Sequence, residues 1–394
     1  MNIAQKMIYH QDSQLTIHNA DALTALKAMP AESAQMCVTS PPYYGLRDYG
    51  TGQWEGGNVD CDHIKPITNY NKGFNERYSN DDGTAAQKQE VKSAGQYSGT
   101  CKKCGAVRTD QQIGMEETPE LFIAKLVDVF REVRRVMKDD GTCWINIGDS
   151  YWGGKGQSGS GGKEFQQMRV ETGVSFSSPA AHVGGNGKTR PTDKKHESIK
   201  AKDLIGIPWM LAFALRADGW YLRSEIIWHK LNPMPESVTD RPTKAHEQIF
   251  LLSKSAKYFY DADAVREPWA DDRKGSSATV SLRYSEESGR NGDSGLGKQP
   301  PFDGRNRRSV WSIASAPYSD AHFATFPPAL IEPCILAGSR IGDVVLDPFG
   351  GSGTTAEVAN KFGRKAVLIE LNPDYCELAM KRNCQKTLFA GAEV

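Results

Sequence analysis

Residues 344–370 are the part of this sequence that most restricts its possible folds. The apolar run 344–346 is followed by an aspartate, and the glycine-rich stretch 350–353 comes shortly after it. A helix is expected over 354–362, and the next apolar run, 365–369, ends in a glutamate. Two strands joined through a helix pair in parallel by a crossover connection. The segment therefore predicts a parallel sheet covered by helices.

The remainder of the chain continues this alternation. The expected strands are 15–18, 34–39, 142–147, 222–228 and 247–252, and the expected helices are 22–29, 119–137 and a stretch that ends at 217. The helix that opens at Pro119 has its apolar residues at helical spacing and is expected to stop at Asp139–Gly141. Strands that alternate with helices predict an α/β fold with a mostly parallel, twisted sheet and helices on both faces.

Three polar segments interrupt the pattern, at 51–112, 152–200 and 262–318. We interpret them as insertions, of which 152–200 is locally basic and flexible. Over the whole chain, 48 Lys and Arg balance 48 Asp and Glu, so the net charge gives no general attraction to nucleic acid. A local basic groove remains compatible with this balance.

The cysteines indicate a metal site. No apolar run approaches membrane-spanning length and the first residues lack the apolar core of a signal peptide, so a soluble, cytoplasmic protein with no membrane partner is expected. Disulfides are rare in that compartment. Cys61, His63, Cys101 and Cys104 form two tight pairs suited to a structural Zn²⁺ in the first insertion. An incidental Cys-x-x-Cys is the alternative.

The glycine-rich stretch also predicts a nucleoside cofactor. Glycines allow the backbone to approach a ligand closely, and a carboxylate after the next strand suits ribose hydroxyls. The stretch is not a phosphate loop, because no lysine follows its last glycine, and it is not Gly-x-Gly-x-x-Gly. Asp347 would repel a pyrophosphate but could pair with a cation. S-adenosylmethionine is cationic and fits best; an ordinary strand-to-helix turn is the alternative.

A second motif, Thr39-Ser40-Pro41-Pro42-Tyr43, follows the expected strand 34–39. Together with Asp347-Pro348-Phe349-Gly350-Gly351-Ser352-Gly353-Thr354, it resembles the amino-group (N4-cytosine or N6-adenine) DNA methyltransferases with the beta-type motif order. The resemblance implies a Rossmann-like, circularly permuted methyltransferase fold. It implies a catalytic part over 1–261, a target-recognition region over 262–318 and a cofactor-binding part over 319–394.

The resemblance also assigns roles to individual residues. Ser40, Pro41, Pro42 and Tyr43 would be catalytic, and Trp228 and Lys230 would line the pocket for the base. The cofactor-binding residues would be Asp21 (adenine), Glu370 (ribose), Thr325 and Phe326 (methionine tail), and Asp347, Phe349, Gly351, Gly353 and Thr354 (loop). The expected partner is double-stranded DNA, contacted by Arg305, Arg307 and Arg308 near Trp311. A cognate restriction endonuclease and a homodimer are further candidate partners.

The catalytic motif has a chemical rationale. An exocyclic amine of a base is a poor nucleophile because its lone pair is delocalised into the ring. Ser40 Oγ and the Pro41 carbonyl are two acceptors that can localise this lone pair, and the paired prolines hold them in place. Tyr43 can stack on a base flipped out of the duplex. The resemblance associates serine in the first position with N4 of cytosine, because members of that family that act on adenine more often carry Asp or Asn; N6 of adenine is the alternative.

Other functions remain to be weighed. Methylation at carbon 5 of cytosine needs a nucleophilic cysteine, but Pro333-Cys334 lies in an apolar run and indicates a buried structural cysteine. A nucleotide-binding oxidoreductase would make the Ser-Pro-Pro-Tyr motif incidental, and the lack of Gly-x-Gly-x-x-Gly argues against it. A DNA-binding protein that has lost catalysis is disfavoured by the intact motif.

Overall fold

The computed structural model describes residues 6–46, 51–63, 99–110, 112–153, 191–193, 195–268, 304–315 and 326–387. They belong to two compact units. The first unit comprises Met1–Tyr44, Pro119–Ser150 and Gly206–Val394, and the second comprises Gly45–Thr118 and Tyr151–Ile205.

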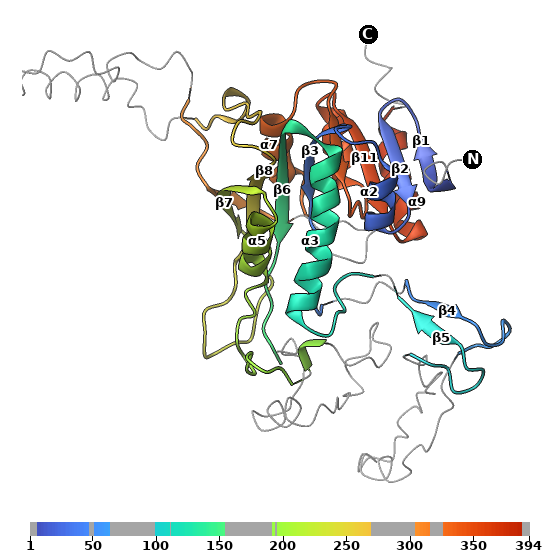
Figure 1. The fold of residues 1–394 in the computed structure, drawn as a ribbon. Coiled ribbons are helices and arrows are strands. Elements are labelled where there is room, and N and C mark those ends of the chain that lie inside the picture. The colour runs from blue at the N-terminus through green and yellow to red at the C-terminus, as the bar shows by residue number, and fades with distance from the viewer. Residues whose placement is uncertain are drawn as a thin grey trace, which may run out of the picture. The chain divides into compact units, whose positions relative to one another are not determined.

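A nine-stranded sheet forms the centre of the first unit (Figure 1). Its strands are β1 (Ile8–Gln11), β2 (Leu15–Asn19), β3 (Ala34–Thr39), β6 (Met137–Ile147), β7 (Tyr221–Lys230), β8 (His246–Ser253), β9 (Val310–Ile313), β10 (Val344–Asp347) and β11 (Lys365–Glu370). Their spatial order is β1-β2-β11-β10-β3-β6-β8-β7-β9. Only β1 and β8 run against the others. The predicted mostly parallel α/β fold is confirmed.

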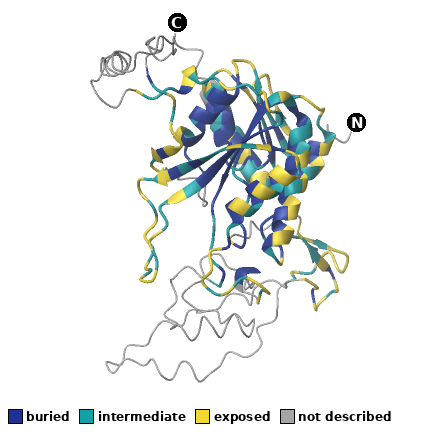
Figure 2. Cartoon of the chain, turned by 60° about the vertical axis from the view of Figure 1, so that its left-hand side comes forward, coloured by how far each residue is buried: buried dark blue, intermediate teal, exposed yellow. Residues whose placement is uncertain are grey.

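Two layers of helices cover the faces of this sheet (Figure 1). One layer contains α2 (Ala22–Ala28), α3 (Pro119–Val136) and α5 (Ile207–Ala217), and the other contains α7 (Pro328–Gly338), α8 (Thr354–Lys361) and α9 (Pro373–Thr387). A short 3-10 helix, η4 (Asp263–Val265), precedes the polar third segment. Helix α3 buries the apolar face expected from its spacing, including Phe122, Leu126 and Phe130. Buried residues accordingly concentrate in the strands and on the inner helix faces (Figure 2).

The end of α3 differs from the prediction. The helix stops at Val136, and Asp139–Gly141, predicted to terminate it, lie inside strand β6. Gly141 is required there by close packing, because a Cβ would come within 2.6 Å of the Gln35 carbonyl oxygen on β3. The pairing of β3 with β6 also shifts register between Ala34 and Met36. The Asp-Asp-Gly sequence therefore marks an irregular strand pairing and not a turn.

Several elements were not predicted. Strand β1 forms one edge of the sheet, and β9 forms the other edge within the polar segment 262–318. In the second unit, β4 (Gln53–Glu55) and β5 (Val107–Thr109) pair as a two-stranded antiparallel sheet, and η3 (Pro191–Asp193) is a short 3-10 helix. Among the helices in the described ranges, none combines the length and apolar character needed to cross a bilayer.

Candidate active site

The predicted motifs meet at the carboxyl ends of two central strands of the sheet. Strands β10 and β3 are adjacent and parallel. The chain leaves β10 through α8 toward β11 on one side, and it leaves β3 toward β6 on the other side. Ligands of open α/β sheets bind beyond the carboxyl ends of the strands at such a switch in direction. The Gly-rich loop follows β10 and Ser40 follows β3, so both motifs lie at this point.

Asp347 joins the two motifs. Its Oδ1 accepts hydrogen bonds from Thr39 Oγ1 (2.6 Å) and the Phe349 amide (3.0 Å), and its Oδ2 accepts one from Thr355 Oγ1 (2.6 Å). Burial raises the pKa of this carboxyl, although the three donors oppose the increase. Only 1% of the residue is exposed. Three protein donors thus hold the carboxylate, and its pairing with a cationic cofactor stays a prediction.

Glu370 holds the Gly-rich loop from the neighbouring strand. Its Oε2 accepts a hydrogen bond from the Gly351 amide (2.9 Å), and its Oε1 accepts one from the Asn372 amide (2.8 Å). Burial raises the pKa of this carboxyl, while the backbone donors favour its charged form. Glu370 thus orients the loop in addition to its predicted role toward a ribose.

The two predicted loop glycines have different surroundings. Both have a positive φ, 49° at Gly351 and 80° at Gly353. A Cβ at Gly351 would find only the Phe349 carbonyl oxygen, at 3.9 Å, whereas a Cβ at Gly353 would lie 2.9 Å from Ala379 Cα of α9. Gly351 therefore leaves space for a ligand, and Gly353 allows α8 and α9 to pack closely.

Arg382 of α9 holds the Gly-rich loop by hydrogen bonds to two of its side chains. Its Nη1 donates to Ser352 Oγ (3.0 Å) and Thr354 Oγ1 (2.8 Å), and its Nε donates to Glu357 Oε2 (2.6 Å). Thr354, predicted to bind the cofactor, is 3% exposed and directs its hydroxyl to this guanidinium. Its role in the structure is thus to fix the loop. No feature of the sequence indicated the contribution of Arg382.

The other predicted cofactor residues are less constrained by contacts. Asp21 follows β2 at the carboxyl end of that strand. Its Oδ1 caps α2 by accepting a hydrogen bond from the Thr24 amide (2.9 Å). Phe326 is half-buried against the core, and Phe349 is half-buried in the loop. Thr325 lies outside the described residues.

The catalytic motif follows β3 directly. Pro41 is buried, while Ser40, Pro42 and Tyr43 are half-buried. The Tyr43 hydroxyl donates a hydrogen bond to Glu247 Oε2 (2.7 Å). The adjacent Asn146 Nδ2 also reaches this oxygen (3.2 Å). Glu247 and Asn146 could not be predicted to lie here, because their proximity to the motif depends on the order of the strands.

The two predicted base-pocket residues of β7 differ in burial: Trp228 is buried, and Lys230 is partly exposed. Trp228 is 3% exposed and donates from Nε1 to the Ile313 carbonyl (2.9 Å), so it belongs to the core and does not line a pocket. Trp228 is part of the main hydrophobic cluster, together with Val265 and Trp311, and this packing explains its burial. Lys230 lies at the strand end, with Nζ 2.5 Å from Glu247 Oε1 and 4.6 Å from the centre of the Trp228 ring.

The three predicted DNA-contacting arginines gather around β9. Arg305 and Arg308 both pair with Glu267, at 3.4 and 3.1 Å. Arg307 places its guanidinium carbon 4.6 Å from the centre of the Trp311 ring. One carboxylate facing two arginines leaves this cluster with excess positive charge.

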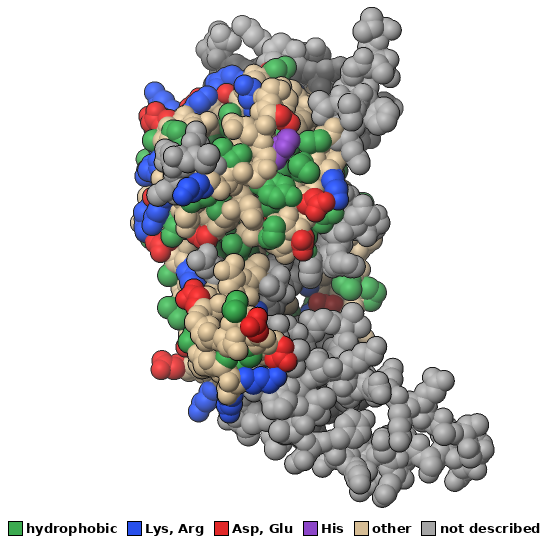
Figure 3. Space-filling view, turned by 90° about the vertical axis from the view of Figure 1, so that its right-hand side faces the viewer, with side chains coloured by type: hydrophobic (Ala, Val, Ile, Leu, Met, Phe, Trp, Pro, Cys, Tyr) green, Lys and Arg blue, Asp and Glu red, His purple; other side chains and the backbone are tan. Residues whose placement is uncertain are grey.

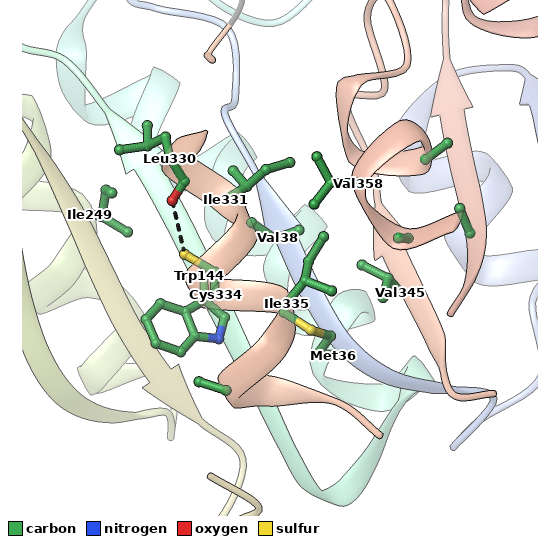
Figure 4. Packing of buried hydrophobic residues seen from close by; sticks show 14 of the residues in the cluster. Met36, Val38, Trp144, Ile249, Leu330, Ile331, Cys334, Ile335, Val345 and Val358 are labelled. Carbon is green, nitrogen blue, oxygen red and sulfur yellow. Dashed lines mark hydrogen bonds between the residues drawn. The ribbon is translucent and has the colours of Figure 1, made fainter. Parts of the chain in front are cut away.

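Cys334 lies in the core, as the sequence indicated (Figure 4). It is 1% exposed within α7, and its thiol lies 3.6 Å from the Leu330 carbonyl oxygen. Burial raises the pKa of this thiol well above its ordinary value. A neutral, covered thiol cannot act as the nucleophile that methylation at carbon 5 requires.

In the second unit, the four predicted metal ligands lie together. Cys61 Sγ is 3.8 Å from Cys101 Sγ, and Cys104 Sγ is 3.6 Å from His63 Nδ1. All four ligand atoms lie within 4.8 Å of one another. The Trp54 ring stacks on the His63 ring, with 4.3 Å between the centroids.

Known proteins resemble this chain in sequence and fold. Residues 34–381 match the N6/N4 methyltransferase family, described as DNA methylase. The chain is 39% identical to Type II methyltransferase M.Cfr9I of Citrobacter freundii, over 93% of this chain and 87% of that protein. It is also 39% identical to Type II methyltransferase M.SmaI of Serratia marcescens, over 92% and 88%. PvuII DNA methyltransferase (cytosine-N4-specific) has a similar fold, with a TM-score of 0.51, 14% identity, and coverage of 95% of this chain and 88% of that chain.

Proposed function

The chain belongs to the N6/N4 DNA methylase family and is an S-adenosylmethionine-dependent DNA methyltransferase, and we propose that it methylates N4 of cytosine in double-stranded DNA. The observation that carries the proposed site is the hydrogen bond between Thr39 and Asp347, whereas the choice of cytosine rests on Ser40. This hydrogen bond ties the residue before Ser40 to the Gly-rich loop, so a methyl donor on that loop and an amine at Ser40 would be neighbours.

The residues around this point fit a nucleoside cofactor. Gly351 has open space where a side chain would stand, and Glu370 and Asp21 follow the two adjacent strands. In the proposed site, Glu370 would face the ribose, Asp21 the adenine and Phe326 the methionine tail. S-adenosylmethionine supplies an electrophilic methyl group when bound.

The chain itself supplies the acceptors and the geometry. Ser40 Oγ and the Pro41 carbonyl would accept the two N–H groups of the amine and so localise its lone pair for attack on the methyl group. Pro41 is buried, which restricts movement of its carbonyl. The transfer would break the S–CH3 bond and form an N–CH3 bond, leaving a neutral thioether, and the methylated amine would release one proton to water. No covalent bond to the enzyme is needed. Serine has a neutral hydroxyl, and the resemblance associates it with cytosine more than adenine.

The base can be identified by direct analysis of the product. Duplex DNA of mixed sequence, incubated with the enzyme and S-adenosylmethionine, is digested to nucleosides and analysed by mass spectrometry. We expect N4-methylcytosine. N6-methyladenine would overturn the choice of base but retain the reaction class, whereas 5-methylcytosine would contradict the role proposed for the Ser40 motif.

The arginine cluster of β9 supports contact with DNA. Arg308 has 67% of its side chain exposed. The three positive charges of Arg305, Arg307 and Arg308 outnumber the one negative charge of Glu267. Such residues suit phosphate contacts, which position a protein without reading the sequence. On the face near β1, in contrast, basic and acidic side chains of the described residues are interspersed (Figure 3). The Type II relatives support a role as the modification partner of a restriction endonuclease.

We also propose that Cys61, His63, Cys101 and Cys104 bind a structural Zn²⁺. A tetrahedral site with Zn–S of about 2.3 Å and Zn–N of about 2.0 Å separates its ligand atoms by about 3.5–3.8 Å. The separations of 3.8 Å between Cys61 and Cys101 and of 3.6 Å between Cys104 and His63 agree with this spacing. Among the described residues around the β4–β5 sheet, the apolar cluster contains two buried side chains, Cys101 and Ala106. A metal would therefore supply stability that packing does not.

Metal analysis tests the zinc site. We expect about one zinc per chain after purification without chelators, and a loss of most of it in Cys101→Ser because three ligands hold zinc poorly. Cys376→Ser, a buried cysteine of α9 outside the cluster, is the control and should retain full zinc content. Equal zinc content in all three proteins, or none in the wild type grown with added zinc, would contradict the assignment.

A further inference from the structure

Glu247 lies at the centre of a set of contacts around the catalytic motif. Its Oε2 accepts from the Tyr43 hydroxyl (2.7 Å) and from Asn146 Nδ2 (3.2 Å), and its Oε1 pairs with Lys230 Nζ (2.5 Å). Its side chain is 12% exposed. Three donors from three different segments therefore converge on one carboxylate, which fixes its position.

The Tyr43 ring is restrained at a second point. A Cβ at Gly148, just after β6, would lie 2.7 Å from Tyr43 Cε2. The ring thus packs against backbone that only glycine leaves accessible, while its hydroxyl is held by Glu247. These two contacts define the plane of the ring relative to β6 and β8. Tyr43 remains half-buried, so part of its surface is still exposed.

We propose that Glu247 is a positioning residue that holds the Tyr43 ring as the surface on which the flipped base stacks. The inference rests on the proposed function, because it requires a base at the Ser40 motif. Stacking on an aromatic side chain changes affinity for a base by about 10- to 100-fold. A ring that could rotate would bind the base less uniformly, and the amine would meet Ser40 Oγ in the reactive geometry less often.

The charge of Glu247 explains why Lys230 is present. A largely covered carboxylate without a counter-ion would be unfavourable, and Lys230 provides the compensating charge from the adjacent strand β7. Lys230 was predicted to line the base pocket. In this arrangement it acts on the base through Glu247 and Tyr43 and does not read the base directly.

The test uses the full chain with Glu247→Ala, Glu247→Gln, Tyr43→Phe and the double variant Tyr43→Phe/Glu247→Ala. Single-turnover methyl transfer is measured on unmodified duplex DNA. Stacking is measured on a second duplex that carries the fluorescent cytosine analogue pyrrolocytosine at the methylated position found by product analysis. Glu247→Ala and Tyr43→Phe should each lower the rate by about 10- to 100-fold and raise the fluorescence of the flipped base. The double variant should be no slower than the slower single variant, because both remove the same hydrogen bond.

Two controls separate positioning from folding. Glu247→Gln keeps an acceptor for the Tyr43 hydroxyl and should recover most of the rate and the fluorescence signal. Glu225→Ala makes the same chemical change on β7, away from Tyr43, and should methylate like the wild type. Binding of S-adenosylmethionine should change less than twofold in every variant.

The outcomes distinguish this inference from the proposed function. If the wild type transfers no methyl group to DNA, the proposed function fails. If the wild type is active but Glu247→Ala keeps its rate and its fluorescence within twofold, the positioning role alone is overturned. Additive losses in the double variant would also overturn it, because Glu247 and Tyr43 would then act independently.

Discussion

Replacing Ser40 with alanine is expected to lower the rate of methyl transfer by about 100- to 1,000-fold, the usual loss when one preorganised polar contact to the reacting group is removed. The side-chain hydroxyl is one of two acceptors proposed for the amine, and the Pro41 carbonyl would remain. Ser40 is half-buried and follows β3, so a smaller side chain should leave the sheet unchanged. The rate is measured in a single turnover with saturating S-adenosylmethionine.

Ser33→Ala is the matched control for this variant. Ser33 lies before β3, at the opposite end of the strand, where its hydroxyl donates to the Pro30 carbonyl (2.8 Å). We expect the rate of Ser33→Ala to stay within twofold of the wild type, and both variants to bind S-adenosylmethionine normally. A Ser40→Ala enzyme that keeps its rate would show that the hydroxyl does not activate the amine.

Gly353→Ala is expected to lower the free energy of unfolding by about 2–5 kcal/mol and to abolish most cofactor binding. A residue with a side chain at a φ of 80° costs about 1–2 kcal/mol, and forcing an atom into a packed region costs about 1–3 kcal/mol more. The added methyl would meet Ala379 Cα at 2.9 Å, which is backbone and cannot rotate away. Helix α8 would shift from α9, and the loop before it would move as well.

The control for this variant is Gly342→Ala, in the exposed turn before β10. Gly342 has a φ of 85°, but a Cβ there would meet no atom within 4 Å. Only the cost of the positive φ applies here. We therefore expect the free energy of unfolding to fall by about 1–2 kcal/mol and cofactor binding to stay normal. Urea unfolding and titration with S-adenosylmethionine measure both properties. Equal losses in the two variants would exclude a packing role for Gly353.

Much of the fold follows from local patterns in the sequence. The apolar runs that became β2, β3, β10 and β11 are short and bounded by polar residues, and α3 shows its buried face at helical spacing. These signals depend on neighbouring residues only. The irregular start of β6 could not be predicted, because Gly141 is explained by the Gln35 carbonyl on another strand. Strand β9 was missed because a four-residue edge strand leaves a weak pattern.

The site was predicted less completely than the fold, for the same reason. The motifs containing Ser40 and Gly351 are continuous in sequence, so they could be recognised. The burial of Trp228 was not foreseen, because it depends on core residues from distant parts of the chain that pack in the same cluster. Glu247 and Arg382 were missed because each supports its motif from a distant part of the chain.

The order of the strands has a consequence for the synthesis of the protein. Strands β2 and β3 are not neighbours; β11 and β10 stand between them. Thr39 and Asp347, which hydrogen-bond in the folded protein, are 308 positions apart in the sequence. At 5–20 residues per second, a ribosome needs roughly 15–60 s to cover that distance. During this time the facing edges of β2 and β3 have no strand to pair with, and unpaired edges favour aggregation. The site joined by Thr39 and Asp347 can therefore form only once β10 and β11 have emerged.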